Sequence, residues 1–357
     1  MIKSKSSILK SLGKWNYDEI KISEPNQDQA IVKIISCGIC STDIVRSMQT
    51  GFYSYPIVPG HEMIGKIYKL GGKNSTLREG DKVCVYPLIT KCNDEYCCGH
   101  SHGLYGYGKV PNLCSDYDFL GSRSHGGYSE YVLSPTKNLV RIPDSLNNDL
   151  AVFTEPASVA LHAYNTAKKD IKFDTVIILG LGPIGILLAS WCKLNKIKNV
   201  VGVDRNENRF KIFKDLGFKK IINTKSDDFL SKLNDFGFKK GVEVAFECSG
   251  SEELLSKGIL SLVKRGKIVV LSNQIKDLTL NTQVLNKFLR NEIKITGSWS
   301  SVIEPHNEWS ETLEMLNSDR LLVKGLISHR YKFSEVKKIF PDLFKKKIKY
   351  SKVLLQP

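Results

Sequence analysis

The chain has 357 residues, of which 41% are hydrophobic and 25% are charged, and its formal net charge is +15. This length predicts two domains with a large buried core, and the composition is typical of a soluble globular protein. No apolar run of about 18 residues or more occurs, which argues against a membrane-spanning helix and against a membrane partner. The basic N-terminal stretch MIKSKSSILKSLGKW lacks the apolar segment of a secretory signal, so we expect a cytoplasmic protein.

The positive charge is spread along the chain, with one local cluster at 344–352, FKKKIKYSK. Nucleic-acid-binding proteins show a basic stripe with interleaved aromatic residues or a recognisable module, and neither is visible here. We therefore expect no nucleic-acid partner. The lysines are explained by a well-solvated surface, or by a positive field that draws an anionic small substrate.

The chain divides by pattern into three segments. Residues 1–157 contain short apolar runs separated by glycine, proline and asparagine, which predicts an irregular, mostly β domain with short helices. Residues 158–296 alternate between strand-like and helix-like segments, which predicts a doubly wound parallel sheet of about six strands. A 3.6-residue apolar spacing that runs to Leu262 predicts one of its helices. Residues 297–357 are too few for a third domain, so we expect them to pack on the first.

Candidate metal ligands occur in three separate segments. SCGICSTD contains Cys40, PGHE contains His61 and Glu62, and FTEPASVALHA contains Glu155. A catalytic zinc takes three protein ligands and keeps one position open, and Cys40, His61 and Glu155 can supply that set, with Glu62 as a fourth, exchanging ligand. Each motif alone also has an ordinary explanation, because paired cysteines can be buried thiols and His-Glu after Pro-Gly can be a capped turn.

Two residues beside these candidates have side chains that suit supporting roles. Thr42 lies two residues after Cys40, and its hydroxyl can bond the substrate oxygen and pass its proton outward. Asp43 can accept a hydrogen bond from the second ring nitrogen of His61, which would fix the tautomer of the imidazole.

A second group of possible ligands lies in KCNDEYCCGHSHGLYGYGKVPNLC. Its four cysteines are Cys92, Cys97, Cys98 and Cys114. Without a secretion signal, clustered cysteines indicate metal ligands rather than disulfides, and four thiolates are typical of a structural zinc site. Adjacent thiols rarely reach one ion without strain, so His100 or His102 can replace one of them. The alternative is a loop with reduced thiols.

The stretch TVIILGLGPIGILLASWCKLNKIKNVVGVD, residues 175–204, has the order of a strand, a tight turn, a helix and a second strand. Its turn contains Gly180, Gly182 and Gly185 in G-x-G-x-x-G spacing, with Pro183 and Ile184 between the last two. These glycines allow the turn, the approach of a pyrophosphate to the backbone, and close packing of helix on strand. The helix N-terminus would bind the pyrophosphate of a dinucleotide. The alternative is a βαβ unit without a ligand.

An acid and a later turn complete the predicted dinucleotide site. Asp204 ends the second strand, 19 residues after Gly185, where an acid binds a ribose 2′-OH. A carboxylate there favours NAD over NADP because it repels a 2′-phosphate. Arg205 and Arg209 are close enough in sequence to weaken that preference, or are ordinary solvated charges. Ser249, in the turn ECSG after a later strand, is expected near the cofactor ribose.

Taken together, these motifs carry a resemblance that covers essentially the whole chain. The motifs GICSTD, PGHE, the cysteine cluster, GGYSEYV, EPASVALHA and GLGPIG…VD resemble those of the zinc-dependent medium-chain dehydrogenase family. Within it, YPIVPGHE, YDFLGSRSHGGYSEYV, the Glu-Pro after Thr154, GSW at 297–299, EW at 308–309 and LISHR at 326–330 resemble the polyol and polyol-phosphate dehydrogenases.

The resemblance implies a GroES-like catalytic domain, a Rossmann domain and hydride transfer between an alcohol carbon and nicotinamide. It assigns Cys40, His61 and Glu155 as catalytic zinc ligands, with Glu155 where many alcohol dehydrogenases have a cysteine, and Glu62 as accessory ligand. Thr42 matches the hydroxyl that begins a proton relay, but Val45 stands where some relatives continue it with histidine. The cysteine spacing C-x4-C-C-x15-C also departs from the C-x2-C-x2-C-x7-C of relatives.

Three further residues are candidates for substrate contact. Arg123 and His125, in GSRSHGG, match positions where polyol-type relatives line the cleft, and Arg123 is either an anchor for a substrate phosphate or a surface arginine. Trp299 either shapes the substrate pocket or fills the core.

The sequence therefore predicts an NAD-dependent, zinc-containing secondary-alcohol dehydrogenase. Its expected substrate is a polyol or a polyol phosphate similar to galactitol 1-phosphate, and its expected assembly is a homodimer or homotetramer. One alternative is an NAD(P)H-dependent ketose or ketose-phosphate reductase that serves surface polysaccharide synthesis. Another is an NAD-binding or nucleic-acid-binding protein without catalysis, against which the intact set Cys40, Thr42, His61 and Glu155 argues.

Overall fold

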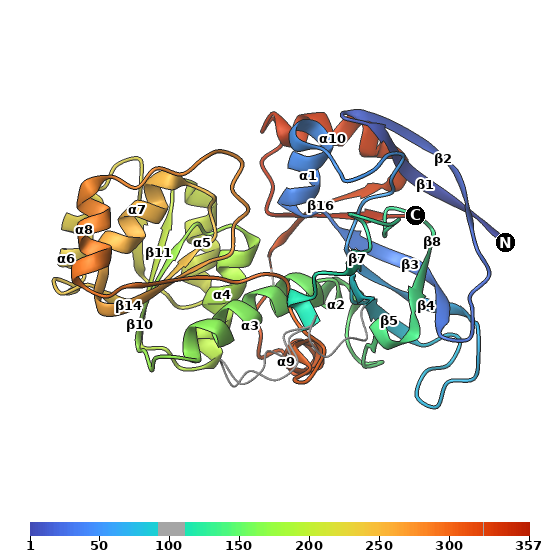
Figure 1. The fold of residues 1–357 in the computed structure, drawn as a ribbon, viewed down its shortest axis with the longest axis horizontal. Coiled ribbons are helices and arrows are strands. Elements are labelled where there is room, and N and C mark those ends of the chain that lie inside the picture. The colour runs from blue at the N-terminus through green and yellow to red at the C-terminus, as the bar shows by residue number, and fades with distance from the viewer. Residues whose placement is uncertain (92–110, 324) are drawn as a thin grey trace. The chain divides into compact units, whose positions relative to one another are not determined.

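The computed structural model describes residues 1–91, 111–323 and 325–357. The chain forms two compact units (Figure 1). Unit 1 consists of Met1–Glu155, Val302–Asp319 and Ile327–Pro357, and unit 2 of Pro156–Ser301 and Arg320–Leu326. In the part of the chain that the structure describes, no helix is long and apolar enough to span a membrane.

Unit 1 is built on a seven-stranded sheet with the order β16-β17-β3-β4-β5-β9, in which β8 also pairs with β3. Its strands are β3 (Gln29–Gly38), β4 (Glu62–Leu70), β5 (Lys82–Val85), β8 (Tyr131–Pro135), β9 (Leu139–Arg141), β16 (Ile327–Lys332) and β17 (Lys352–Gln356). The central strand β3 is rich in β-branched residues and is mostly buried, as expected for a strand covered on both faces. The core around it joins residues from both ends of the chain, including Leu9, Phe340 and Val353.

Two hairpins and several short helices surround this sheet. The hairpins pair β1 (Ile2–Ser11) with β2 (Lys14–Ile22), and β6 (Leu88–Thr90) with β7 (Tyr117–Phe119). The helices are α1 (Ser41–Val45), the π-helix η1 (Arg46–Thr50), the 3₁₀ turns η2 (Pro111–Leu113), η3 (Thr136–Asn138) and η4 (Phe333–Glu335), α2 (Asn148–Ala151), α9 (Glu308–Asn317) and α10 (Val336–Phe344).

Unit 2 is a six-stranded parallel sheet with the order β12-β11-β10-β13-β14-β15. Its strands are β10 (Thr175–Leu179), β11 (Asn199–Asp204), β12 (Lys220–Asn223), β13 (Val242–Glu247), β14 (Leu262–Val270) and β15 (Lys294–Gly297). Its helices are α3 (Thr154–Lys168, which begins in unit 1), α4 (Pro183–Leu194), α5 (Glu207–Asp215), α6 (Phe229–Asp235), α7 (Glu252–Leu260) and α8 (Thr282–Arg290). This is the strand order of the doubly wound dinucleotide-binding fold, which confirms the predicted fold class.

One predicted helix boundary in unit 2 is wrong. The apolar spacing extended a helix to Leu262, but α7 ends at Leu260 and Leu262 begins β14. Ser261 caps the helix, because its N–H and its hydroxyl both bond the carbonyl of Gly258. Leu262 is fully buried, and a buried apolar residue at a helix–strand junction satisfies both patterns.

Candidate active site

Three of the predicted metal ligands come together in unit 1. Cys40, His61 and Glu62 each offer one ligand atom, and these atoms lie within 4.8 Å of one another. Sheet pairing brings them together, because Glu62 at the start of β4 pairs with Gly38 at the end of β3. Cys40 follows β3 directly as the N-cap residue of α1. The ligand atoms thus gather where two neighbouring antiparallel strands meet a helix N-terminus.

Glu155 adds a buried carboxyl group to this part of unit 1. It lies in the first turn of α3 and is 8% exposed. Burial raises the pKa of its carboxyl to about 7. The charge of His61 lowers this pKa, and the charge of Glu62 raises it. The ligand atoms within 4.8 Å do not include Glu155. Among the described residues, its carboxylate has no hydrogen-bond partner, so it enters the interior without a compensating donor.

The imidazole of His61 is oriented by a buried acid. His61 Nδ1 lies 3.3 Å from Asp43 Oδ1, as the sequence predicted for this pair. The other carboxylate oxygen of Asp43 accepts hydrogen bonds from the Tyr128 hydroxyl at 2.7 Å and from the backbone N–H of Cys40 at 3.2 Å. With Nδ1 held by Asp43, the second ring nitrogen of His61 is left to face a ligand.

The acidic side chains around Cys40 and His61 would be stabilised by a bound cation. Burial alone lowers the pKa of His61, but Asp43 and Cys40 outweigh it and raise the pKa well above its ordinary value. The acidic neighbours Asp43 and Cys40 thus favour a positive charge at His61, whereas the pKa of Glu155 is raised mainly by burial. A thiol, an imidazole and carboxylates are also the donor types that zinc prefers. The residues present therefore fit a zinc ion, which would replace these protons.

Lys352 is a member of this group that the sequence did not reveal. Its ammonium nitrogen lies 2.6 Å from each carboxylate oxygen of Glu62, and the residue is 3% exposed. Burial lowers the pKa of Lys352, but Glu62 outweighs this and raises it. In the sequence Lys352 ends the basic run 344–352, which we interpreted as solvated surface. Only the pairing of β17 with β3 shows that this lysine turns inward.

The predicted glycine turn of unit 2 has the expected geometry. Gly180 has a φ of +100°, which favours glycine, and Gly182 is the N-cap residue of α4 with Pro183 and then Ile184 following. A Cβ at Gly185 would collide with the carbonyl oxygen of Gly180, whereas a Cβ at Gly182 would meet nothing within 4 Å. The helix therefore packs tightly at Gly185 and leaves open space in front of its first turn, where an anion can bind.

Asp204 is buried and accepts four hydrogen bonds. Oδ2 accepts from the backbone N–H of Leu181 at 2.8 Å and from the guanidinium of Arg209 at 2.9 Å. Oδ1 accepts from the backbone N–H groups of Arg205 and Asn206 at 2.7 and 2.9 Å. The acid thus ties the glycine turn to the end of β11. The side chain of Arg209 forms an ion pair with Asp204, whereas Arg205 contacts Asp204 through its backbone N–H.

The remaining candidates of unit 2 lie at two different surfaces. Ser249 donates both its N–H and its hydroxyl to Glu247 at the end of β13, and its Cβ lies 3.0 Å from the place of a Cβ on Gly180. It therefore borders the glycine turn, and its expected place near the cofactor ribose stays a prediction. Trp299 follows β15 and is 39% exposed, so it does not fill the core.

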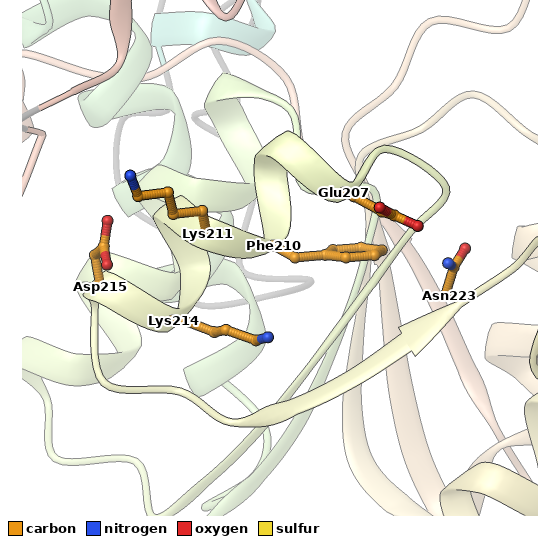
Figure 2. A pocket seen from close by; sticks show the side chains of 6 residues that line it. All are labelled: Glu207, Phe210, Lys211, Lys214, Asp215 and Asn223. Atoms are coloured by element: carbon orange, nitrogen blue, oxygen red, sulfur yellow. The ribbon is translucent and has the colours of Figure 1, made fainter.

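A hollow on unit 2 lies away from the glycine turn residues and is formed by α5 and the end of β12 (Figure 2). Its lining residues are Glu207, Phe210, Lys211, Lys214, Asp215 and Asn223. Figure 2 shows the ring of Phe210 pointing toward Asn223. Two lysines are balanced by two carboxylates here, and the lining residues include no thiol or imidazole, so they do not resemble the ligand set of unit 1.

Two family models match the chain. The alcohol dehydrogenase GroES-like domain matches residues 26–144, and the zinc-binding dehydrogenase model matches residues 183–318. The chain belongs to the zinc-dependent medium-chain dehydrogenase family. It is therefore an oxidoreductase, for which zinc and a nicotinamide dinucleotide are the expected cofactors.

Individual relatives place the chain in the polyol branch of this dehydrogenase family. It is 30% identical to sorbitol dehydrogenase of Halalkalibacterium halodurans over 341 residues, 93% of each chain. It is 28% identical to galactitol 1-phosphate 5-dehydrogenase of Escherichia coli K12 over 337 residues, again 93% of each. The crystal structure of galactitol-1-phosphate dehydrogenase from Escherichia coli superposes with a TM-score of 0.86 at 27% identity, covering 99% of this chain and 100% of that one.

The predicted second zinc site of this dehydrogenase remains a prediction. Cys92, Cys97 and Cys98 lie outside the described residues. Cys114 is described and is buried, and its thiol lies 3.0 Å from the carbonyl oxygen of Asp116.

Proposed function

We propose that this protein is a zinc-dependent dehydrogenase that transfers a hydride between a secondary alcohol of a polyol or polyol phosphate and NAD. The observation that supports it most directly is the cluster of Cys40, His61 and Glu62, whose ligand atoms lie within 4.8 Å of one another, with the buried carboxyl of Glu155 interacting with His61 and Glu62. The relatives that act on sorbitol and on galactitol 1-phosphate support the substrate class.

Cys40, His61 and Glu155 would hold the zinc. Glu62 would be an accessory ligand, because its ion pair with Lys352 competes with binding to the metal. Zinc bound there supplies a Lewis acid that lowers the pKa of an alcohol, and the nicotinamide ring supplies the hydride acceptor. Asp43 and Tyr128 fix the direction of the His61 ring, so that the ligand nitrogen needs no reorientation when the ion binds.

Thr42 is the residue placed to handle the proton of the alcohol. Its Oγ1 lies 3.1 Å from the Cys40 thiol, to which it donates a hydrogen bond, so the hydroxyl borders the ligand group. In the reaction Thr42 Oγ1 accepts the proton of the substrate hydroxyl and releases its own. Val45 has no polar atom on its side chain, so this proton leaves by water rather than through residue 45.

Asp204 supports a preference for NAD. Its carboxylate stands at the end of β11 beside the glycine turn, where a 2′-phosphate would meet a negative charge. The ion pair with Arg209 reduces that charge, so we propose a preference for NAD without complete exclusion of NADP.

The decisive experiment is a panel of polyols and polyol phosphates offered to zinc-replete protein with NAD⁺ or NADP⁺. Absorbance of the reduced cofactor is followed, and the matching ketoses and ketose phosphates with NADH report the reverse direction. Turnover of at least one pair is expected, with NAD⁺ preferred. No turnover with any member in either direction contradicts the proposed function.

We further propose that the protein assembles as a homodimer or homotetramer through the edge of the unit 2 sheet. The edge strand β15 pairs only with β14 among the described residues. Ile295 on β15 and Leu285 and Leu289 on α8 are 43, 45 and 59% exposed, which is unusual for large apolar side chains close in sequence. Light scattering should show that Leu289→Asp lowers the mass of the particle while the control Leu12→Asp, an exposed leucine of unit 1, does not. An unchanged mass for Leu289→Asp contradicts this interface.

A further inference from the structure

Two arginines of unit 1 stack on a shared tyrosine. The guanidinium carbon of Arg123 lies 4.2 Å from the ring centre of Tyr53 and 4.4 Å from that of Tyr117. The guanidinium carbon of Arg46 lies 4.6 Å from the ring centres of both Tyr53 and Phe52. These five residues form what we call the arginine–tyrosine stack. Each guanidinium thus lies over two aromatic rings, an arrangement that attracts cations to the ring faces.

Hydrogen bonds hold the side chain of Arg46 beside the loop that carries Arg123. Arg46 donates from Nε to the carbonyl of Gly51 at 3.2 Å and from Nη1 to the hydroxyl of Ser122 at 2.7 Å. Ser122 precedes Arg123 in the chain, so the first arginine is tied to the loop that carries the second. An arginine held in this way has already lost the side-chain freedom that binding a ligand would otherwise cost.

The positive charge of the stack is not neutralised. Neither Arg46 nor Arg123 contacts a carboxylate among the described residues. Other arginines of the chain do have acidic partners, as Arg209 has Asp204 and Arg330 has Asp149. Two cations that share one aromatic ring repel each other, and an anion bound by both would reduce that repulsion.

Both arginines are linked through their backbone to residues next to the predicted zinc ligands. Arg46 follows Thr42 by one helical turn, and its backbone N–H bonds the carbonyl of Thr42. The backbone N–H of Arg123 bonds the carbonyl of Phe119 at 2.9 Å. The ring of Phe119 in turn packs against the ring of His61, with 5.7 Å between the ring centres. All of these residues belong to unit 1.

We propose that Arg46 and Arg123 together bind the phosphomonoester of the substrate, so that the enzyme acts on a polyol phosphate in preference to the free polyol. This inference rests on the proposed dehydrogenase function and specifies its substrate class. A phosphomonoester carries close to two negative charges at neutral pH and three terminal oxygens. It can therefore engage two guanidinium groups at once, whereas a carboxylate matches the fork of one.

The kinetic test compares a hexitol phosphate with the same unphosphorylated hexitol and with a six-carbon sugar acid. Wild-type protein should prefer the phosphate in kcat/KM. Arg46→Gln and Arg123→Gln should each lower kcat/KM for the phosphate about 10- to 100-fold, mainly through KM, because each removes hydrogen bonds to a charged group. Values for the free hexitol should stay within about twofold on the same grounds.

Two further variants separate binding from folding. Arg78→Gln removes an exposed arginine of unit 1 outside the stack and should change kcat/KM for neither substrate. Tyr53→Leu keeps both charges but removes the shared ring. It should lower kcat/KM for the phosphate less than either arginine variant does. Equal wild-type kcat/KM for phosphate and hexitol, or an equal loss on both substrates in Arg123→Gln, overturns the proposal. A preference for the sugar acid overturns it as well.

A binding measurement tests the stack without turnover. Inorganic phosphate is titrated calorimetrically into zinc-replete protein saturated with NADH, so that the cofactor site cannot bind it. Wild type and Arg78→Gln should bind phosphate, and the double variant Arg46→Gln/Arg123→Gln should not. Phosphate binding that survives in the double variant, or is absent in wild type, overturns the proposal. Loss of binding in the double variant together with no turnover of any polyol would instead support the anion site and contradict the dehydrogenase function.

Discussion

Buried carboxylates occur in both units, but their surroundings differ. In unit 2, Asp204 accepts four hydrogen bonds from the protein. Glu247 likewise accepts from both donors of Ser249, from the N–H of Gly250 and from the hydroxyl of Ser272. In unit 1, Glu155 has no hydrogen-bond partner among the described residues, and burial raises its pKa to about 7.

The surroundings of each buried carboxylate indicate its structural role. A carboxylate whose lone pairs are filled by backbone N–H groups stabilises a turn and needs no ion. A buried carboxylate without donors destabilises the folded protein unless a cation arrives. Asp204 and Glu247 of unit 2 therefore stabilise the turns that hold them. In unit 1, Asp43 and Glu62 have partners in the protein, so Glu155 is the carboxylate of this group that a cation would stabilise.

Metal removal should separate the two units most strongly. Chelation of zinc is expected to reduce turnover to background, because the group around Cys40 loses its Lewis acid. Binding of NADH should persist with at most a small change, since Asp204 and Glu247 are satisfied by the protein. Fluorescence titration of NADH against the chelated protein measures this, and loss of NADH binding in parallel with activity would remove the proposed distinction.

Glu247→Ala should destabilise the protein by about 3 kcal/mol, because it leaves several buried donors without an acceptor. The change is measured by urea unfolding of zinc-replete protein. NADH affinity should fall as well, since Ser249 loses the partner that holds it beside Gly180. A loss of less than about 1 kcal/mol would show that water replaces the carboxylate.

Glu155→Gln should stabilise the zinc-free protein, in contrast to the destabilising change Glu247→Ala. The folded-state pKa of Glu155 is raised to about 7, so its stabilising contribution is present at low pH and is lost as the pH rises toward and beyond 7. The variant lacks this titration and should be more stable than wild type at pH 8 by on the order of 2 kcal/mol, and similar at pH 5.

Zinc should reverse this order, because wild type gains more stability from the ion than the variant does. Thermal unfolding at pH 5 and pH 8, with and without zinc, measures both effects. Glu314→Gln, an exposed position on α9, serves as the matched control. A wild-type protein that is stabilised equally by zinc at both pH values would contradict the assignment of Glu155.

Tyr128→Phe should have the smallest effect of this series. It removes the 2.7 Å hydrogen bond to Asp43 but leaves every ligand in place. Zinc affinity should fall about 10-fold, in line with the loss of one outer hydrogen bond behind a ligand histidine. Competition with a zinc-binding dye gives the affinity, and an unchanged value would mean that Asp43 is held well enough by the N–H of Cys40.

Much of the fold was predictable because its signals are local. The spacing of Gly180, Gly182 and Gly185 and the acid at Asp204 indicate one strand–turn–helix–strand unit, and alternation along the chain indicates the parallel sheet. Leu262 shows the limit, since a buried residue at a junction fits both a helix and a strand.

The candidate site was predictable only where its residues form short motifs. Cys40, His61 and Glu155 stand out by residue type and neighbours, and the structure brings the first two together with Glu62. Lys352 and Tyr128 could not be found in this way, because each reaches the site through pairing between distant segments. The stack of Arg46 on Tyr53 was missed for a similar reason, since two aromatic residues after a short helix have no local signature of a binding site.

The position of Lys352 has a consequence for how the protein is made. A ribosome delivers Cys40, His61 and Glu62 roughly three hundred residues before the strand β17 that carries the lysine. Until that strand emerges, the end of β3 at Cys37 and Gly38 lacks its pairing with β17, and Glu62 lacks its counter-charge. Chains cut short by a premature stop or by proteolysis before residue 352 would therefore enclose an unbalanced acid. The ion pair between Glu62 and Lys352 can thus form only after β17 has been made.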